Sequence, residues 1–343
     1  MSRQQTIAIL GGGIMGLMSA YACAQKRFAV TIYDQAGFPA DNASWIAGGM
    51  LAPYSEIEHM DMRWVRAGLA SISRWHDFPL ETGFQQNGSL LIAHAEDRYI
   101  LERFKDHLPT ELQEYKRPQN IESALPERFK QGLYLEDEAQ ILPETVMRSL
   151  CDYLKDKVTF IQDGKEPDDV QTDWVLDCRG MGAQYKDKDL RGVKGEIALV
   201  RNPEFSLERP VRIMHPRYPL YIVPRPNHVF MIGATVIESE TNAHVSLRSS
   251  MELMSALYSL HSSFGEAQII TFKAGIRPSY PDNLPRIKHS GHIVSANGLF
   301  RHGYLLAPIM AEITAAVIND EDHEFKDLFY EQTNDKAGNQ RVA

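Results

Sequence analysis

Residues 6–16 read Thr-Ile-Ala-Ile-Leu-Gly-Gly-Gly-Ile-Met-Gly, a short apolar run that passes directly into the pattern Gly-x-Gly-x-x-Gly. Thr6–Leu10 has the length and composition of a buried strand, and a helical pattern over Leu17–Lys26 follows the glycines. A second β-branched and aromatic run, Phe28–Tyr33, completes a strand–helix–strand unit. This order predicts a parallel sheet covered by helices on both faces, with a dinucleotide bound at the glycine turn.

Each glycine of the motif has a physical task in binding a pyrophosphate. Gly11 permits a tight turn, Gly13 lets the backbone approach the phosphates, and Gly16 lets the helix pack closely on the sheet. The positive end of the helix faces the phosphate oxygens, and Asp34 ends the second strand where a carboxylate can bind ribose hydroxyls. The residues assigned to the dinucleotide on these grounds are Gly11, Gly13, Ile14, Met15, Gly16 and Asp34.

The glycine motif does not by itself choose the nucleotide. Nicotinamide enzymes and FAD enzymes use the same turn geometry, so both cofactors fit this part of the sequence. A glycine-rich loop without any ligand, with Asp34 as a surface acid in a turn, is the remaining alternative.

Composition limits the class of protein. The chain has 343 residues, of which 43% are hydrophobic and 24% charged, a size and balance that favour two globular domains. The formal net charge of −9 disfavours nucleic acid and anionic membrane surfaces as general partners. No apolar run reaches the length of a membrane-spanning helix. The three cysteines are widely spaced and offer no disulfide framework, which predicts a reducing, cytoplasmic setting.

The middle of the chain differs from its two ends in its predicted secondary structure. Strand patterns over 196–201, 220–225, 229–235 and 269–274 are separated by Pro, Asn and Gly turns, which favours an antiparallel sheet. The predicted fold class is therefore α/β plus antiparallel β, in which a discontinuous Rossmann-like domain is interrupted by a mainly antiparallel domain. The expected ranges are 1–80, 141–192 and 275–335 for the dinucleotide domain, and 81–140 and 193–274 for the inserted substrate domain.

Several further elements are predicted outside these strands. A buried strand is expected over Trp174–Cys178, and another over His292–Ala296 before an apolar helix. The polar residues from Asn319 onward are expected to form a frayed tail. Helices are predicted over Asp61–Asp77, Glu96–His107, Pro143–Lys155, the stretch from Ser246 to His261, and Leu305–Ile318.

Five stretches in order carry a resemblance to a known family. They are Ala43–Pro53 (ASWIAGGMLAP), Tyr221–Arg225 (YIVPR), Ile232–Glu238 (IGATVIE), Ala274–Asp282 (AGIRPSYPD) and Gly298–Pro308 (GLFRHGYLLAP). Together with the glycine motif they closely resemble the D-amino-acid oxidase family of flavoproteins, over residues 6–318. Within that family they are most similar to the glycine oxidases of the thiamine-biosynthesis type.

The resemblance implies non-covalent FAD as the cofactor. No cysteine lies within Arg277–Asp282, where related sarcosine oxidases attach their flavin covalently. In the loop after Ala43, glycines would let the backbone lie flat against an isoalloxazine ring, and the free N–H groups at Gly303 suit charge on its pyrimidine side. Residues matching the family's flavin site, beyond the glycine motif, are Ser44, Ala47, Gly48, Gly49, Met50, Gly180, His302, Gly303, Tyr304 and Leu305.

A carboxylate-bearing substrate is implied in the same way. Arg277 matches the family arginine that clamps the substrate carboxylate, a bidentate task suited to a guanidinium, and the matching Tyr221 hydroxyl binds the same group. Arg301 and Met50 are further expected substrate residues. An Arg277–Asp282 surface pair and a half-buried core Tyr221 are the structural alternatives, and Val236 is expected to pack in the core.

Two departures from the family pattern bear on the nucleotide. The segment 158–174 is short where relatives carry an extra hairpin near the adenine, so the cover of the adenine end is open. Cys178 stands where relatives have a small residue, and we interpret it as a buried hydrophobe. The histidines have no metal-ligand spacing, so no metal is expected.

The activity implied is oxidation of glycine or another small amino acid to the imine and 2-oxo acid, with ammonia and hydrogen peroxide as products. Hand-over of the product to thiazole synthesis is a further implication, and a homo-oligomer is left open. A D-amino-acid dehydrogenase or a sarcosine or amine oxidase of the same fold is the nearest alternative. A non-catalytic FAD-binding protein and a nicotinamide dehydrogenase are the alternatives of other classes. The hydride leaves the α-carbon directly for the flavin, so no catalytic protein base is required.

Overall fold

The computed structural model describes residues 3–58, 60–216, 220–241 and 244–332. The chain divides into two compact units, both built from separate stretches of sequence. Unit 1 comprises residues 1–45, 147–191 and 278–343, and unit 2 comprises residues 46–146 and 192–277. Each unit contains one large sheet, and the two sheets differ in strand direction.

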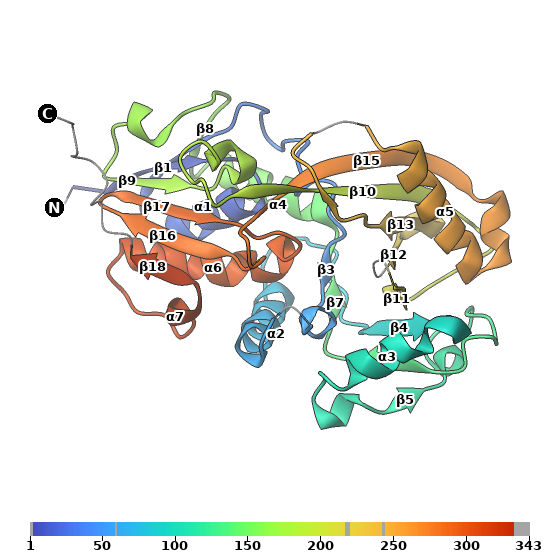
Figure 1. Cartoon of the computed structure of the whole chain (residues 1–343). Helices are drawn as coiled ribbons and strands as arrows, with labels where there is room; N and C mark the ends of the chain where they lie inside the picture. Colours follow the sequence, from blue (N-terminus) through green and yellow to red (C-terminus); the bar gives the residue numbers. More distant parts are fainter. Residues whose placement is uncertain (1–2, 59, 217–219, 242–243, 333–343) are drawn as a thin grey trace, which may run out of the picture. The chain divides into compact units, whose positions relative to one another are not determined.

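The sheet of unit 1 has seven strands, which are mostly parallel (Figure 1). β1 lies in its interior between β2 and β9, and all three run in parallel, as the strand–helix–strand unit predicts. Only the pair β16–β17 is antiparallel. In spatial order the strands are β18 (Tyr330–Gln332), β16 (Arg286–Ser290), β17 (Ile293–Asn297), β9 (Trp174–Asp177), β1 (Thr6–Leu10), β2 (Ala29–Tyr33) and β8 (Thr159–Ile161).

Two apolar helices of unit 1 pack against each other and against this sheet (Figure 1). α1 (Ile14–Gln25) begins three residues before the predicted helix, directly at the glycine turn, and α6 (Gly303–Ile318) begins two residues early. Most residues of α6 are buried, so its apolar composition on all sides reflects a position in the core. The structure therefore confirms the expected Rossmann-like half of the fold.

Unit 2 contains a nine-stranded sheet, in which β11 runs parallel to β4 and the pairs β10–β13, β10–β14, β11–β12, β12–β13, β4–β6 and β5–β6 are antiparallel. The predicted strand over 220–225 is observed with the same bounds as β12. β10 and β15 are longer than the predicted strands over 196–201 and 269–274, and β13 ends two residues before the predicted strand over 229–235. The strands in order are β14 (Ile237–Glu238), β10 (Arg191–Arg201), β13 (Val229–Gly233), β12 (Leu220–Arg225), β11 (Val211–Met214), β4 (Ser89–Ala93), β6 (Gly132–Leu135) and β5 (Tyr115–Lys116), with β15 (Gln268–Ser279) also paired to β10. A separate two-stranded sheet joins β3 (Met50–Leu51) to β7 (Ala139–Gln140).

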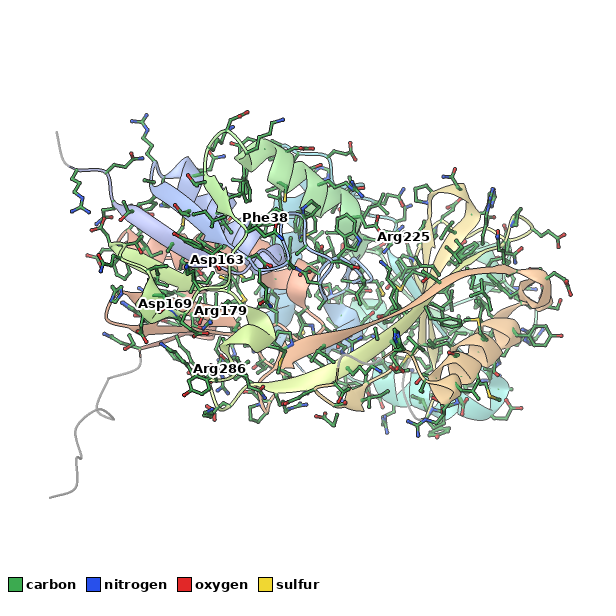
Figure 2. The ribbon with its side chains drawn as sticks, turned by 90° about the horizontal axis from the view of Figure 1, so that it is seen from above. Phe38, Asp163, Asp169, Arg179, Arg225 and Arg286 are labelled. Atoms are coloured by element: carbon green, nitrogen blue, oxygen red, sulfur yellow. The ribbon has the colours of Figure 1, made fainter. Side chains whose placement is uncertain are left out.

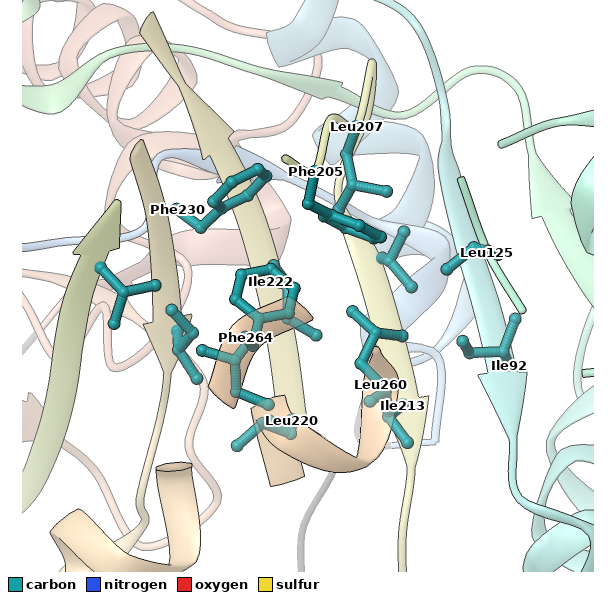
Figure 3. Packing of buried hydrophobic residues seen from close by; sticks show 14 of the residues in the cluster. Ile92, Leu125, Phe205, Leu207, Ile213, Leu220, Ile222, Phe230, Leu260 and Phe264 are labelled. Carbon is teal, nitrogen blue, oxygen red and sulfur yellow. The ribbon is translucent and has the colours of Figure 1, made fainter. Parts of the chain in front are cut away.

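One face of the large sheet is covered by α5 (Leu247–Leu260), and the core between them is aromatic-rich (Figure 3). Ser246 caps this helix, since its hydroxyl accepts a hydrogen bond from the Ser249 N–H. Phe205, Phe230 and Phe264 contact one another edge-on or tilted in the centre of the cluster. The remaining helices are α2 (Met62–His76, capped by Asp61), α3 (Arg98–Lys105), α4 (Pro143–Leu154) and α7 (Lys326–Phe329).

Two regions differ from the sequence-based expectation. Residues 46–80 were expected with the dinucleotide domain but belong to unit 2, because β3 pairs with β7 and Tyr54, Ile57 and Val65 pack into a core with α3. The prediction of a frayed tail from Asn319 onward is wrong for residues 326–332. The buried Phe329 ends α7, and β18 pairs with β16. Residues 333–343, including the last three of the predicted dinucleotide domain, lie outside the described residues.

A buried carboxylate supports the segment that follows β3. Glu138 is completely buried, and its side chain accepts hydrogen bonds from the Ser55 N–H at 2.7 Å, the Ser55 hydroxyl at 2.9 Å and the Ser89 hydroxyl. Arg212 donates to the Ser55 carbonyl from the neighbouring β11. Burial raises the pKa of Glu138 from its ordinary value of 4.5 to about 7, with the serine hydrogen bonds opposing the shift.

Glu138 should make stability depend on pH. Its contribution is fully present below pH 4.5 and is lost as the pH rises through about 7, because the folded state binds the proton more tightly. In denaturant titrations across this range, the wild-type unfolding free energy should fall by about 3 kcal/mol more than that of Glu138→Gln. Glu136→Gln, two residues away and exposed, is the control and should follow the wild type. Parallel curves for wild type and Glu138→Gln would refute this role.

Candidate functional site

The glycine turn of unit 1 leaves no room for side chains. Gly11 has φ +105°, and a Cβ there would lie 2.5 Å from the Cys178 carbonyl oxygen. A Cβ on Gly16 would lie 1.9 Å from the Gly11 carbonyl oxygen, so α1 touches the turn directly. Both positions therefore require glycine, for backbone conformation and for close packing.

The N-terminus of α1 presents backbone donors of the kind that bind phosphate. Gly13 is its N-cap and no side chain of that residue caps the helix, while the Ile14 N–H donates to the Ser44 hydroxyl at 3.0 Å. Asp34 accepts from the Gly12 N–H at 2.6 Å and from the Ala36 N–H at 2.8 Å, one on each carboxylate oxygen. A carboxylate has further lone pairs, so this orientation is compatible with ribose hydroxyls as additional donors.

A second helix N-terminus lies beside the first. His302, 2% exposed, is the N-cap of α6 without a side-chain capping bond, and a Cβ on Gly303 would meet only the Ile14 side chain, at 3.7 Å. The Tyr304 hydroxyl donates to the Ser44 carbonyl at 3.0 Å, and Leu305 is buried. Ser44 thus links the two helix starts, and both dipoles offer positive ends within one unit. This pair of donors fits a dinucleotide with a pyrophosphate and an electron-accepting ring.

The short segment 158–174 is held by an arginine that the sequence did not single out. Arg179 (Figure 2) binds Asp177 through two nitrogens at 2.9 and 2.8 Å, and its third nitrogen donates to Glu166 at 2.6 Å. The fork ties the end of β9 to the loop after β8. Phe38 packs on Phe160 of β8, with ring centroids 4.6 Å apart, on the same side of unit 1.

Gly180 and Cys178 flank Arg179. Gly180 has φ +59° and its carbonyl accepts from Asn297 at 2.9 Å, which fixes the turn after β9. Cys178 is 7% exposed, as expected of a buried hydrophobe, and burial raises the pKa of its thiol. This turn therefore offers neither a reactive thiol nor an acid at Cys178 and Gly180.

In unit 2, the loop 47–50 lies on the large sheet. A Cβ on Gly48 would come within 2.8 Å of the Met231 Cε and 3.5 Å of the Tyr221 ring. Gly49 has φ +67°, and a Cβ there would lie 2.3 Å from the Ile141 carbonyl oxygen. Both glycines are thus needed for packing within the protein, in addition to any contact with a flat ring. Ala47 and Met50 are half-buried.

Arg277 lies across the neighbouring strand of the same sheet. A Cβ on Gly195 in β10 would overlap the guanidinium, 2.2 to 2.6 Å from its terminal atoms, so the missing side chain makes the arginine's position possible. One guanidinium nitrogen donates to the Thr235 carbonyl at 3.2 Å. The side chain is half-buried, and the contact to the Thr235 carbonyl orients the guanidinium.

Tyr221 occupies the same sheet face. Its ring lies over Gly233, where a Cβ would be 2.8 Å from the ring and 2.9 Å from the hydroxyl oxygen. Around it is an apolar cluster of Ile197, Val223, Met231 and Ala234, with Met50 and Leu199 packed against it. The structure therefore places Tyr221, Met50 and Arg277 together in unit 2, on or beside one sheet face.

A buried polar network lies next to Arg277. Glu196 is completely buried; it accepts from Lys194 at 2.7 Å and from the Ser246 N–H at 3.3 Å. Its backbone N–H donates to the Thr235 hydroxyl at 3.0 Å, and the Thr235 N–H donates back to the Glu196 carbonyl. Burial opposes ionisation of Glu196, but the hydrogen bonds from Lys194, Ser249 and Ser246 and the charge of Lys194 together outweigh it and lower the pKa of this carboxyl. Thr235, the acceptor for Arg277, is thereby held rigidly.

Arg301 and Val236 are the remaining expected residues. Arg301 belongs to unit 1, where its guanidinium lies over the Phe300 ring at 5.1 Å, whereas Arg277 and Tyr221 belong to unit 2. The prediction that Val236 packs in the core is wrong. Val236 is 43% exposed, because it lies in the segment between the end of β13 at Gly233 and the start of β14 at Ile237. In the part of the chain that the structure describes, no His, Cys, Asp and Glu group could hold a metal ion, and no helix has the length and apolarity to cross a membrane.

No pattern along the chain predicted the roles of Arg179 and Gly195, but the strand pattern did contain a signal for Arg225. Two-residue alternation along β12 places Arg225 on the face of Tyr221. The structure shows its guanidinium bound to the carbonyl of Gly48, at 2.6 Å. Gly195 lies between two charged residues within a strand, a pattern with no local meaning until the neighbouring strand is known.

Comparison with known proteins agrees with this geometry. The FAD dependent oxidoreductase family, DAO, matches residues 6–317. The chain is 38% identical over 320 residues to the thiamine biosynthesis oxidoreductase ThiO of Rhizobium etli, which covers 92% of this chain and 97% of that protein. It is 28% identical to the bifunctional protein ThiO/ThiG of Trichormus variabilis, across 92% of this chain and 53% of the relative.

The fold also matches a solved structure. The crystal structure of glycine oxidase from Geobacillus kaustophilus superimposes with a TM-score of 0.81 at 21% sequence identity, covering 94% of this chain and 96% of the other. At that identity the likeness establishes the fold, and the two-unit architecture is shared nearly from end to end.

The contact between Gly16 and Gly11 gives a direct test of the nucleotide site. Gly16→Ala places a methyl group 1.9 Å from the Gly11 carbonyl, so α1 must move away from the turn. Such overpacking costs about 1–3 kcal/mol, and FAD affinity should fall about tenfold or more in fluorescence titrations of the apoprotein. Gly164→Ala is the matched control, because a Cβ at this exposed glycine meets only the Gln35 side chain, at 3.7 Å. Equal FAD affinity in the two variants would exclude the assigned role of the turn.

Proposed function

The chain belongs to the FAD dependent oxidoreductase family, and on that premise we propose that it oxidises the carbon–nitrogen bond of glycine or another small amino acid. The products are the imine, which hydrolyses to the 2-oxo acid and ammonia, and hydrogen peroxide from reoxidation by oxygen. The observation that carries this proposal is the half-buried guanidinium of Arg277, held over Gly195 on the sheet face that also bears Tyr221.

We assign Arg277 and Tyr221 to the substrate carboxylate. A guanidinium binds a carboxylate with two parallel hydrogen bonds, and the contact to the Thr235 carbonyl sets the direction of the fork. The Tyr221 hydroxyl supplies a further donor from the same face. These contacts fix two of the substrate's few heavy atoms, which orients the α-carbon without any group that must move a proton.

Bound FAD supplies the two-electron acceptor for the hydride of the α-carbon. The protein's part is position and environment. Ile197, Val223 and Met231 make the surroundings of Tyr221 apolar, which strengthens the electrostatic hold on a carboxylate by excluding water. Met50, packed on this cluster, is assigned to the same lining, and Arg301 is kept as a proposed substrate residue of unit 1.

We also propose a setting for the reaction. A relative in which ThiO is joined to ThiG supports delivery of the product to thiazole formation, and the similarity to ThiO of Rhizobium etli points the same way. Three free cysteines, two of them buried, support a reducing cytoplasm. A homo-oligomer is compatible with both the link to thiazole formation and the cytoplasmic location.

The decisive experiment uses the colour of the purified protein. The FAD-loaded chain should be yellow, lose its visible absorbance when glycine is added under nitrogen, and regain it with formation of peroxide when air is admitted. Sarcosine and D-alanine, tested in parallel, define the substrate class. Bleaching without peroxide formation in air would replace the oxidase by a dehydrogenase, and colour that persists with every amino acid would refute the enzymatic function.

Arg277→Ala should separate substrate binding from cofactor binding. Loss of a half-buried charged contact to the carboxylate is expected to raise KM for glycine by about two orders of magnitude, while FAD stays bound. Gly195→Ala should act in the same direction with Arg277 still present, because its methyl group displaces the guanidinium. Arg248→Ala, at an exposed position on α5, is the control. A near-normal KM in Arg277→Ala would rule out the clamp.

A further inference from the structure

A second arginine of the same sheet holds the loop assigned to the flavin. Arg225 ends β12 and is half-buried (Figure 2). One terminal nitrogen donates to the Gly48 carbonyl at 2.6 Å and the other to the Ile141 carbonyl at 3.4 Å. The guanidinium therefore joins two segments of chain that are far apart in sequence, through their backbones.

The surrounding contacts make this loop a rigid unit. The Ile141 N–H donates to the Gly49 carbonyl at 2.8 Å, and the next residues pair as strands, Met50 with Gln140. Gly48 packs on Met231 and Tyr221, and Gly49 has φ +67°, a conformation that needs glycine. Three successive residues, 48 to 50, are thus fixed through their backbones, and Arg225 supplies the only charge among the contacts described for them.

We propose that Arg225 is a positioning residue that sets the redox properties of the bound flavin through the Gly48–Gly49 peptide. In a planar trans peptide, the carbonyl and the following N–H point in opposite directions. Because the Gly48 carbonyl points toward the guanidinium, the Gly49 N–H points away from it. A cation on the carbonyl also polarises the peptide, which makes that N–H a stronger donor. With residues 48–50 at the flavin, a stronger donor beside the ring would stabilise the negative charge that develops on reduction and would raise the ring's affinity for electrons.

This inference rests on the proposed function, in that residues 48–50 face the flavin. It assigns Arg225 no contact with substrate, which distinguishes it from Arg277. The contacts to Gly48 and Ile141 use two nitrogens of the guanidinium, so the effect depends on the geometry of this group as well as on its charge. A lysine could bind one carbonyl as a point charge but could not bridge both.

The test compares Arg225→Met and Arg225→Lys in the full-length, FAD-loaded protein. Arg225→Met should lower the midpoint potential of the flavin, measured with reference dyes. It should also weaken FAD binding by about ten- to a hundredfold, because one charge-assisted hydrogen bond is lost. The rate of flavin reduction at saturating glycine should fall, with KM changed little. Arg225→Lys should give a potential between those of Arg225→Met and the wild type.

Arg201→Met is the matched control. Arg201 is exposed and lies at the end of β10. Arg201 and Arg225 pair with the same residue, Val229, from its two neighbouring strands. A wild-type potential and FAD affinity in Arg225→Met, with lowered thermal stability alone, would reduce Arg225 to a structural residue and overturn the proposal. If Arg225→Met does not fold, a wild-type potential in Arg225→Lys overturns it and a lowered one supports it. Failure of the wild type to bind FAD would instead refute the proposed function.

Discussion

The structure of unit 1 depends on the approach of α1 to the turn that precedes it, where Gly16 touches the carbonyl of Gly11. With any side chain at either position the helix would stand away from the sheet, and its first N–H groups would no longer lie at the carboxyl end of β1. The same short distance brings Ile14 to Ser44 and Gly303, so that α6 starts beside α1. One backbone contact thereby determines two helix starts and the donors they present.

Unit 2 uses missing side chains for a different purpose. Gly195 and Gly233 leave hollows in a sheet face, and the side chains of Arg277 and Tyr221 lie in them. A strand pays an entropic penalty for glycine in its interior, so a glycine under a functional side chain indicates that close approach outweighs local stability. The rigid pairing of Thr235 with Glu196 adds the hydrogen-bond acceptor that aims Arg277.

Local signals predicted the parts of the fold that local chemistry decides. The β1–α1–β2 unit, the bounds of β12 and the helices that begin after Asp61 and Ser246 follow from apolar spacing and glycines. Residues 46–80 and β18 could not be placed in this way, because long-range packing decides where they belong. At the site, motifs predicted which residues would meet ligands, and strand alternation placed Arg225 on the face of Tyr221. Gly195 and Thr235 act through neighbours on other strands and have no signature along the chain.

Arg277 and Arg225 of the unit 2 sheet both bind backbone carbonyls, and the type of acceptor has a physical consequence. Arg179 of unit 1 is paired with two carboxylates, which makes it a structural clasp with little field beyond its partners. A carbonyl also orients a guanidinium but carries no net charge, so the contacts to Thr235, Gly48 and Ile141 set the direction of Arg277 and Arg225 without adding a negative charge. Replacing either carbonyl contact by an acidic side chain would place a negative charge beside the guanidinium, which is why the acceptor matters as much as the arginine.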